Sequence, residues 1–296
     1  MVGENEQMRK LIYVSDCKVH DKLKRQYDAF ITFVNGENDD VVPDGSYYTL
    51  AEFTKYIREV KPYGVGFAFE SQDELEYVIN LIYDFIGSIN LAAKHNKVFD
   101  FSPLEKCTEL VAIQMYWNTK QERLWDIRKN TKLKSFEIMD YYKVSDLSAF
   151  RGSTVEHLSF YGCNGCSSFV SKMHVADFSF LLDMPKLTEL RFDIIKDEPS
   201  EYYLRILSKL QGLKTFYTPD SFFTFQQFAW LKAKMPNVEK GLDCVLQVSD
   251  WYCIIGRRTP KTLDDPAKIE RYQKRYDTLV EKYKTRENPP SDDEKD

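Results

Sequence analysis

The sequence has few of the residues and none of the motifs from which most enzyme sites are built. It contains 4 histidines, too few for any single pairing to be suggestive. No glycine-rich phosphate loop, G-x-S-x-G nucleophile elbow or H-E-x-x-H zinc motif occurs. Its 46 acidic residues make carboxylate pairs so common that none stands out. We therefore expect a protein that is not an enzyme and that uses no cofactor.

Long apolar runs and blocks of basic charge are also missing. No stretch of 18 apolar residues exists, so we expect no membrane span. The 41 Lys and Arg are outnumbered by 46 Asp and Glu, and such a surface repels a phosphate backbone, so we expect no nucleic-acid partner. The opening MVGENEQMRKLIYVSDCK lacks the basic-then-apolar order of a secretory signal. This predicts a cytoplasmic protein whose cysteines are reduced thiols.

The sequence does contain an internal repeat. The pattern apolar-x-x-apolar-x-apolar occurs in KLKSFEI (132–138), TVEHLSF (154–160) and KLTELRF (186–192), and related versions lie on both sides. Segments between these triplets carry apolar residues three and four apart, which is typical of one-sided helices, at 72–85, 122–130, 202–210 and 225–235. The units begin, with separations of 22 to 32 residues, at Pro62, Ile86, Leu110, Leu133, Val155, Leu187, Leu213 and, less clearly, Val238.

These repeats resemble the leucine-rich repeat family, and specifically its bacterial cytosolic members with irregular, aromatic-substituted units. The resemblance covers roughly residues 60–242. It implies a right-handed α/β solenoid with a parallel β-sheet on the concave side and helices on the convex side, in which each unit buries its apolar face only by stacking on its neighbours.

Both ends of this solenoid need caps, because a terminal repeat exposes an apolar face. LIYVSD and DAFITFVN predict strands and TLAEFTKYIREV a helix. CVLQVSDWYCIIG predicts a β-hairpin, and AKIERYQKRYDTLVEKYKTRE an amphipathic helix that either covers the last repeat, as we expect, or binds a partner. The predicted domains are an N-terminal cap or degenerate repeats (1–60), the solenoid (61–242), a C-terminal cap of hairpin and helix (243–285) and a disordered tail (286–296).

The most conspicuous motif is Cys163-x-x-Cys166. Cys163 is the ninth residue of its repeat, as Asn118 is in an earlier unit. In the family that this sequence resembles, Asn or Cys at this position satisfies backbone groups in the turn after the strand. We therefore interpret Cys163 as a turn residue. The alternative is a zinc or redox site through both cysteines, with His157 and His174 as further zinc ligands, although no second closely spaced Cys or His pair is present.

The same region contains an insertion. The spacing of 32 residues between Val155 and Leu187 exceeds that of the other units, and the additional residues fall near CNGCSSFVSKMHVAD (163–177). An insertion in a repeat array maps to a loop on one face. Phe169, Val170 and Met173 would either fold inward or give the concave rim an apolar lip.

Strand geometry predicts a binding surface. If the fourth and sixth positions of each unit are buried, the third and fifth face the concave side, with the seventh just beyond. We expect this face to bind a protein or peptide, as an adaptor or a toxin-neutralising protein would. The alternative is a glycan or small molecule bound by the stripe of Tyr116, Met139 and Tyr161. The predicted binding residues are Gln114, Tyr116, Glu137, Met139, His157, Ser159, Tyr161, Glu189, Arg191, Asp193 and Tyr217.

Overall fold

A ten-stranded β-sheet runs through the protein. The computed structural model describes residues 11–15, 19–20, 26–27, 29–34, 45–93, 97–162, 172–248, 251–256, 262–263 and 265–294. Eight neighbouring strands, from β14 to β4, are parallel, and β1 and β5 complete the sheet through antiparallel pairs. Their order is β14 (Thr215–Tyr217), β12 (Glu189–Phe192), β10 (His157–Tyr161), β9 (Ser135–Met139), β8 (Ala112–Tyr116), β7 (Ser88–Ala93), β6 (Gly64–Phe69), β4 (Ala29–Val34), β1 (Leu11–Ser15) and β5 (Gly45–Thr49).

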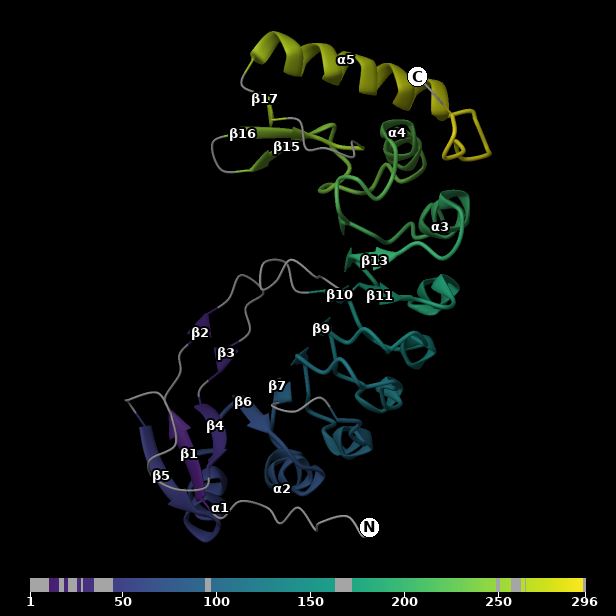
Figure 1. The fold of residues 1–296 in the computed structure, drawn as a ribbon. Coiled ribbons are helices and arrows are strands. Elements are labelled where there is room, and N and C mark those ends of the chain that lie inside the picture. The colour runs from purple at the N-terminus through teal and green to yellow at the C-terminus, as the bar shows by residue number, and fades with distance from the viewer. Residues whose placement is uncertain are drawn as a thin grey trace, which may run out of the picture.

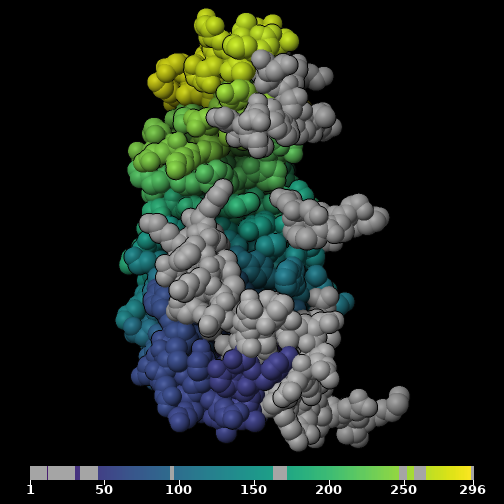
Figure 2. Space-filling view, turned by 90° about the vertical axis from the view of Figure 1, so that its left-hand side faces the viewer, coloured from purple at the N-terminus to yellow at the C-terminus, as the bar shows by residue number. Residues whose placement is uncertain are grey.

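The elements follow an arc with the strands on its inner side and the helices on its outer side (Figure 1). Seen from the open side of the arc, the described residues from β6 onward follow one another in chain order toward the C-terminal end (Figure 2). None of the helices in the described ranges is both long and apolar enough to cross a bilayer. The helices are α1 (Leu50–Val60), α2 (Gln72–Ile82), α3 (Ser200–Leu207), α4 (Phe225–Lys234) and α5 (Pro266–Tyr283), with 3-10 turns η1 (Ser102–Lys106), η2 (Ile127–Lys129), η3 (Ser148–Phe150) and η4 (Phe178–Asp183).

The register of the parallel strands follows the predicted phase of the repeat. Residues at the sixth repeat position, such as Phe67, Met115 and Phe160, are aligned between neighbouring strands, and so are those at the fourth position. The chain therefore forms an α/β repeat-like structure in which equivalent positions are those that the sequence predicts. The aligned residues of the fourth position are Val65, Ile89, Ile113, Phe136, Leu158, Leu190 and Phe216.

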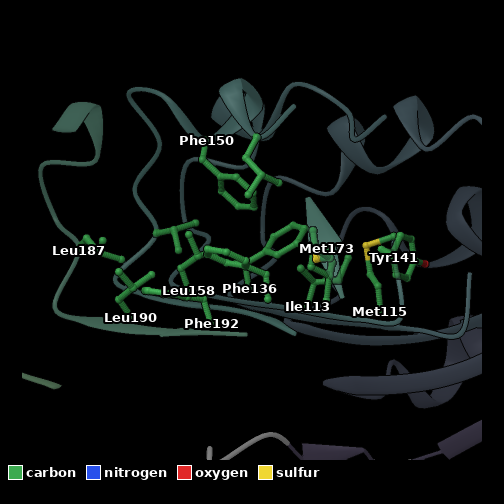
Figure 3. Packing of buried hydrophobic residues seen from close by; sticks show 14 of the residues in the cluster. Ile113, Met115, Phe136, Tyr141, Phe150, Leu158, Met173, Leu187, Leu190 and Phe192 are labelled. Atoms are coloured by element: carbon green, nitrogen blue, oxygen red, sulfur yellow. The ribbon is translucent and has the colours of Figure 1, made fainter. Parts of the chain in front are cut away.

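The core between the sheet and the outer layer contains a chain of aromatic rings, which we call the aromatic spine. In Figure 3, Phe136 rises from the sheet toward Phe150, which descends from the outer layer, and their ring centroids are 4.8 Å apart. Burying each such side chain stabilises the fold by roughly 1.5–3 kcal/mol. Ring centroids 4.8 to 6.4 Å apart connect, in order, Phe69, Phe99, Phe101, Trp125, Phe136, Phe150, Phe180, Phe160, Phe192 and Phe222.

The outer layer differs from the prediction in its middle. The helical patterns at 72–85, 202–210 and 225–235 correspond to α2, α3 and α4, whereas the pattern at 122–130 contains only the 3-10 turn η2. Asn130, which is 1% exposed, explains the difference, because its side chain fixes a turn in place of a helix. Its Nδ2 donates to the carbonyl oxygens of Leu104 (2.8 Å) and Cys107 (2.9 Å) in the preceding unit. Its Oδ1 accepts from Trp125 Nε1 at 2.7 Å.

The N-terminal end matches the predicted strands and helix. β1 and β4 form from the two predicted strand segments, and α1 begins at a capping box in which Thr49 and Glu52 bond each other's backbone N–H. A short pair, β2 (Val19–His20) and β3 (Gln26–Tyr27), lies on the inner side of the arc (Figure 1). β3 contacts β6 and β7. The inner side is therefore covered at β6 and β7.

The C-terminal end contains the predicted hairpin and helix. β15 (Val245–Val248) and β16 (Trp251–Ile254) form the hairpin, and β17 (Thr262–Leu263) adds a third strand. α5 packs on α4, and its buried Tyr276 donates from Oη to the carbonyl oxygen of Leu242 at 2.8 Å. The helix therefore packs against α4 and Leu242 at the C-terminal end of the array, where we expect a covering helix.

The segment after α5 differs from the prediction of a disordered tail. Pro289 and Pro290 are buried, and Asp292 accepts hydrogen bonds from Ser200 Oγ (2.5 Å) and Gln227 Nε2 (3.1 Å). Burial by itself would raise the pKa of Asp292, but the hydrogen bonds from Ser200 and Gln227 outweigh it and lower that pKa. Residues 286–294 thus pack on α3 and α4, because buried polar groups of those helices need the partners that this segment provides.

Candidate binding surface on the inner side of the sheet

A row of polar side chains at the fifth repeat position crosses the inner side of the sheet. Asn90 on β7 donates to Gln114 on β8 at 3.0 Å, and Gln114 donates in turn to Glu137 on β9. Ser159 and Arg191 are the aligned residues of β10 and β12. Parallel, in-register pairing therefore places one polar side chain per strand in a continuous line toward β14.

Part of this row is buried, contrary to the prediction that the whole row faces solvent. Gln114 is 6%, Glu137 3% and Ser159 7% exposed. Polar groups tolerate burial when they are hydrogen-bonded, and the contacts from Asn90 through Gln114 to Glu137 satisfy this condition for Gln114 and Glu137. These three predicted binding residues consequently contribute to the strand-to-strand structure and offer little contact area. The accessible part of the row begins at Arg191.

A pocket opens where the row reaches β12 and β14. Its volume is about 680 Å³, within the range of natural ligand sites. The pocket combines residues from four parts of the chain, and four of the predicted binding residues are among them. It is lined by Tyr161, Lys172, Arg191, Phe192, Asp193, Tyr217, Thr218 and Pro219.

The charged groups of the pocket are arranged in two different ways. Lys172 Nζ lies 2.7 Å from Asp193 Oδ1, so this buried carboxylate is neutralised within the protein. The guanidinium of Arg191 lies 4.6 Å from the centre of the Tyr161 ring and is exposed. Among the described residues, Arg191 forms no ion pair with a carboxylate. This contact restricts the guanidinium, and its N–H donors have no acceptor among the described residues.

Two exposed aromatic residues lie at this side of the sheet. Tyr217 on β14 is 42% exposed and lines the pocket. Trp117, directly after β8, is 58% exposed, and its backbone has a φ of 61°. A left-handed conformation costs a bulky residue about 1–2 kcal/mol. Its N–H donates to the Met139 carbonyl oxygen at 3.2 Å, which holds the residue at the carboxyl edge of the sheet.

The other predicted residues form the surroundings of the pocket. His157 and Glu189 are half-buried neighbours at the third repeat position. Tyr116, Met139 and Tyr161 are also half-buried and aligned, so the predicted stripe exists as a continuous feature. Only Tyr161 of the stripe lines the pocket.

We interpret the ninth repeat position as a turn residue at Asn118 and Cys163, and the structure describes only Asn118. Asn118 Oδ1 accepts from the backbone N–H groups of Lys120 (3.2 Å) and Gln121 (3.1 Å), which confirms that this side chain satisfies the turn. Cys163 and Cys166 lie outside the described residues. Within the described ranges, no cluster of three or more His, Cys, Asp or Glu side chains is placed to hold a metal ion.

The insertion contributes to the core at its described end. Met173 is fully buried, as Figure 3 shows, and its strand β11 (Met173–His174) pairs with β13 (Ile194–Ile195). Phe169 and Val170 lie outside the described residues. His174 Nδ1 lies 2.8 Å from Asp197 Oδ1 on the exposed side of this small sheet.

Five residues of the candidate site are absent from the sequence-based set, and two of them, Phe192 and Pro219, only add apolar wall to the pocket. Lys172 belongs to the insertion, so repeat counting gives it no position. Thr218 is the sixth residue of its unit, where an apolar residue is expected. The polar residue at this position was the sequence signal that could have marked it as part of the site. Trp117 follows the strand, and only its left-handed backbone and exposure distinguish it from a core aromatic residue.

Comparison with known proteins provides no functional assignment. No protein-family model matches the chain, and no curated protein matches it in sequence.

Proposed function

We propose that the protein is a non-enzymatic recognition module of the leucine-rich-repeat type, in which the inner side of a solenoid holds a protein or peptide partner. The observation that carries this proposal is the juxtaposition of the exposed Tyr217 with Arg191, which lies over Tyr161 and has no ion pair among the described residues, at a pocket of about 680 Å³. Arginine and large aromatic residues are the types that dominate binding energy at protein interfaces.

Three further features support a preformed surface. The polar row is fixed by hydrogen bonds from Asn90 to Glu137, and its rigid sheet limits the ordering cost of binding. Trp117 is held exposed in a costly backbone conformation, which is typical of functional positions. The β3 strand contacts β6 and β7, so the proposed partner would use the part of the inner side from β8 to β14.

Site-specific photo-crosslinking tests this proposal. A benzoylphenylalanine at position 217 or 117 is expected to cross-link a defined partner in lysate of cells that express the protein natively. The matched control replaces Tyr83, an exposed tyrosine at the end of α2 on the outer side, 38% exposed. Equal cross-linking from position 83, or none from positions 117 and 217, would contradict the proposal.

A second candidate function is binding of a glycan or small molecule. The pocket volume and its two tyrosines, Tyr161 and Tyr217, favour this alternative. It predicts that a purified metabolite or glycan fraction raises the unfolding temperature of the wild-type protein and not that of Tyr217→Ala. A protein partner cross-linked at position 217 would exclude it as the main function of this pocket.

A further inference from the structure

We infer that the pocket at β12 and β14 is a carboxylate subsite, in which Arg191 receives a carboxylate of the bound partner. This inference rests on the proposed recognition function and specifies the chemistry of the partner. Two sources share this chemistry, namely the free C-terminus of a peptide and the side chain of an Asp or Glu residue.

The orientation of Arg191 is the first step of the argument. Its guanidinium lies 4.6 Å from the centre of the Tyr161 ring, and the side chain is exposed at the pocket. A guanidinium stacked on a ring has lost much of its rotational freedom before the ligand arrives, and its edge presents parallel N–H donors that match the two oxygens of a carboxylate. Arg191 is therefore preorganised for a planar anion.

The internal pairing of the pocket leaves Arg191 as its available cation. Lys172 Nζ already contacts Asp193 Oδ1 at 2.7 Å, and the side chain of Asp193 is 9% exposed. Arg191, by contrast, has no carboxylate partner among the described residues. Among the described residues, the pocket thus contains one paired cation, Lys172, and one cation without an ion pair, Arg191, which an incoming monoanion could contact.

The neighbouring carboxylates favour a carboxylate over a phosphate. Glu189 and Asp193 lie two residues before and after Arg191 along the same chain direction, so each is about 6.6 Å away along the strand. A phosphate carries about 1.5 to 2 negative charges near neutral pH, and repulsion from Glu189 opposes it more strongly than it opposes a single charge, whereas Asp193 is already paired with Lys172. The site suits an anion of charge minus one.

The remaining wall is apolar and holds one hydroxyl without a partner. Tyr217, Phe192 and Pro219 provide surface for the carbon atoms next to the carboxylate. Thr218 Oγ1 is buried and, within the described part of the chain, has no hydrogen-bond partner. Such a group is costly, and an acceptor that enters the pocket beside it would relieve this cost.

The test uses small probes and ligand-observed saturation-transfer NMR on the full chain. The probes are N-acetyl-phenylalanine, its C-terminal amide, N-acetyl-glutamyl-phenylalaninamide and N-acetyl-phosphotyrosine amide. A fragment of this size is expected to bind with a Kd on the order of 1 mM. The free acid reports a C-terminal carboxylate, the glutamyl probe a side-chain carboxylate, and the simple amide the apolar contribution alone.

The expected result is binding of at least one carboxylate probe at least tenfold tighter than the simple amide. Arg191→Gln should weaken that probe at least tenfold, and Arg191→Lys, which keeps the charge and loses the planar fork, should weaken it several-fold. The matched control is Arg271→Gln, because Arg271 also lies over a tyrosine, Tyr272 at 5.8 Å, but on α5 away from the pocket. It should leave binding unchanged.

Several outcomes would overturn the inference. Absence of binding by both carboxylate probes, an effect of Arg271→Gln equal to that of Arg191→Gln, or tightest binding by the phosphotyrosine probe would each contradict a carboxylate subsite. If these outcomes occur while positions 117 and 217 still cross-link a partner, the recognition function stands and only the carboxylate chemistry fails. Loss of cross-linking with retained carboxylate binding would contradict the recognition function alone.

Discussion

Replacing Asn130 by alanine should destabilise the protein far more than a single side chain of this size usually does. Asn130 is 1% exposed and joins two consecutive units through three hydrogen bonds of 2.7, 2.8 and 2.9 Å. The carbonyl oxygens of Leu104 and Cys107 each keep one backbone donor, from Cys107 and Leu110. The indole N–H of Trp125 would be left without a hydrogen-bond acceptor among the described residues.

The size of the destabilisation follows from what each of these three groups loses. Two carbonyl groups that lose one of two partners cost about 1 kcal/mol each, and a buried indole N–H left without an acceptor costs about 1–3 kcal/mol. Asn130→Ala should therefore lower the free energy of unfolding by about 4 kcal/mol, measured by urea denaturation followed by far-UV circular dichroism. Trp125→Phe combined with Asn130→Ala should be less destabilising than the sum of the single variants, because both remove the same bond.

Asn118 provides a matched control. It is also a buried asparagine in a turn, but its Oδ1 accepts two bonds of 3.1 and 3.2 Å and its Nδ2 has no partner among the described residues. Asn118→Ala should cost about half as much as Asn130→Ala. Equal losses for the two variants, or a loss below about 1 kcal/mol for Asn130→Ala, would refute the idea that this side chain links neighbouring units.

Three further predictions concern the C-terminal segment and the thiols. Asp292→Ala should destabilise the protein by about 2 kcal/mol in urea denaturation, because Ser200 and Gln227 lose a charged acceptor. An effect no larger than that of an exposed Lys→Ala change would show that residues 286–294 do not pack on α3 and α4. The side-chain hydrogen bond from Arg286 lowers the pKa of Glu294 below 4.5, so the stabilisation from the Glu294 carboxylate is present above that pH and is lost as the pH falls through the lowered value. The difference in unfolding temperature between wild type and Glu294→Gln should therefore shrink on acidification from pH 6 to about pH 3. A constant difference would contradict this. Burial raises the pKa of Cys107 and of Cys244 to about 12. Iodoacetamide at about pH 8 should therefore label both thiols at least tenfold more slowly in native than in urea-unfolded protein, as measured by peptide mass spectrometry. Equal labelling rates would show that these thiols are accessible.

The strand framework could be predicted from the sequence because its signal is local and repeated. An apolar residue at the fourth position of each unit has to face the same core, and a shift by one residue would turn it toward solvent. The units that begin at Pro62 and Leu213 have incomplete patterns, yet their neighbours determine their register. Repetition thus compensates for weak individual units.

The outer layer and the C-terminal segment could not be predicted in this way, because long-range contacts decide them. The pattern at 122–130 has the spacing of a helix, but the bonds of Asn130 to the preceding unit fix a turn. The composition of residues 286–294 is that of a disordered segment, but buried groups of α3 and α4 order it. In both cases the groups that decide the structure lie far away in the sequence, so the local sequence pattern does not include them.

The binding surface could be predicted as a face but not as a pocket. Strand alternation places Tyr161, Arg191, Asp193 and Tyr217 on one side of the sheet, and these four residues line the pocket. Alternation cannot show that hydrogen bonds between neighbouring strands withdraw Glu137 from solvent. It also cannot place Lys172, which reaches the pocket from an insertion.

The backbone conformation of Trp117 has an evolutionary consequence. Its φ of 61° suits glycine or asparagine better than tryptophan, so mutational drift at this position leads toward a more stable protein. Under the proposed function, a tryptophan persists there only while selection for binding exceeds that gain. Descendants of this sequence that lose their partner are therefore expected to replace Trp117 early, by glycine, asparagine or aspartate, while the phenylalanines of the aromatic spine remain.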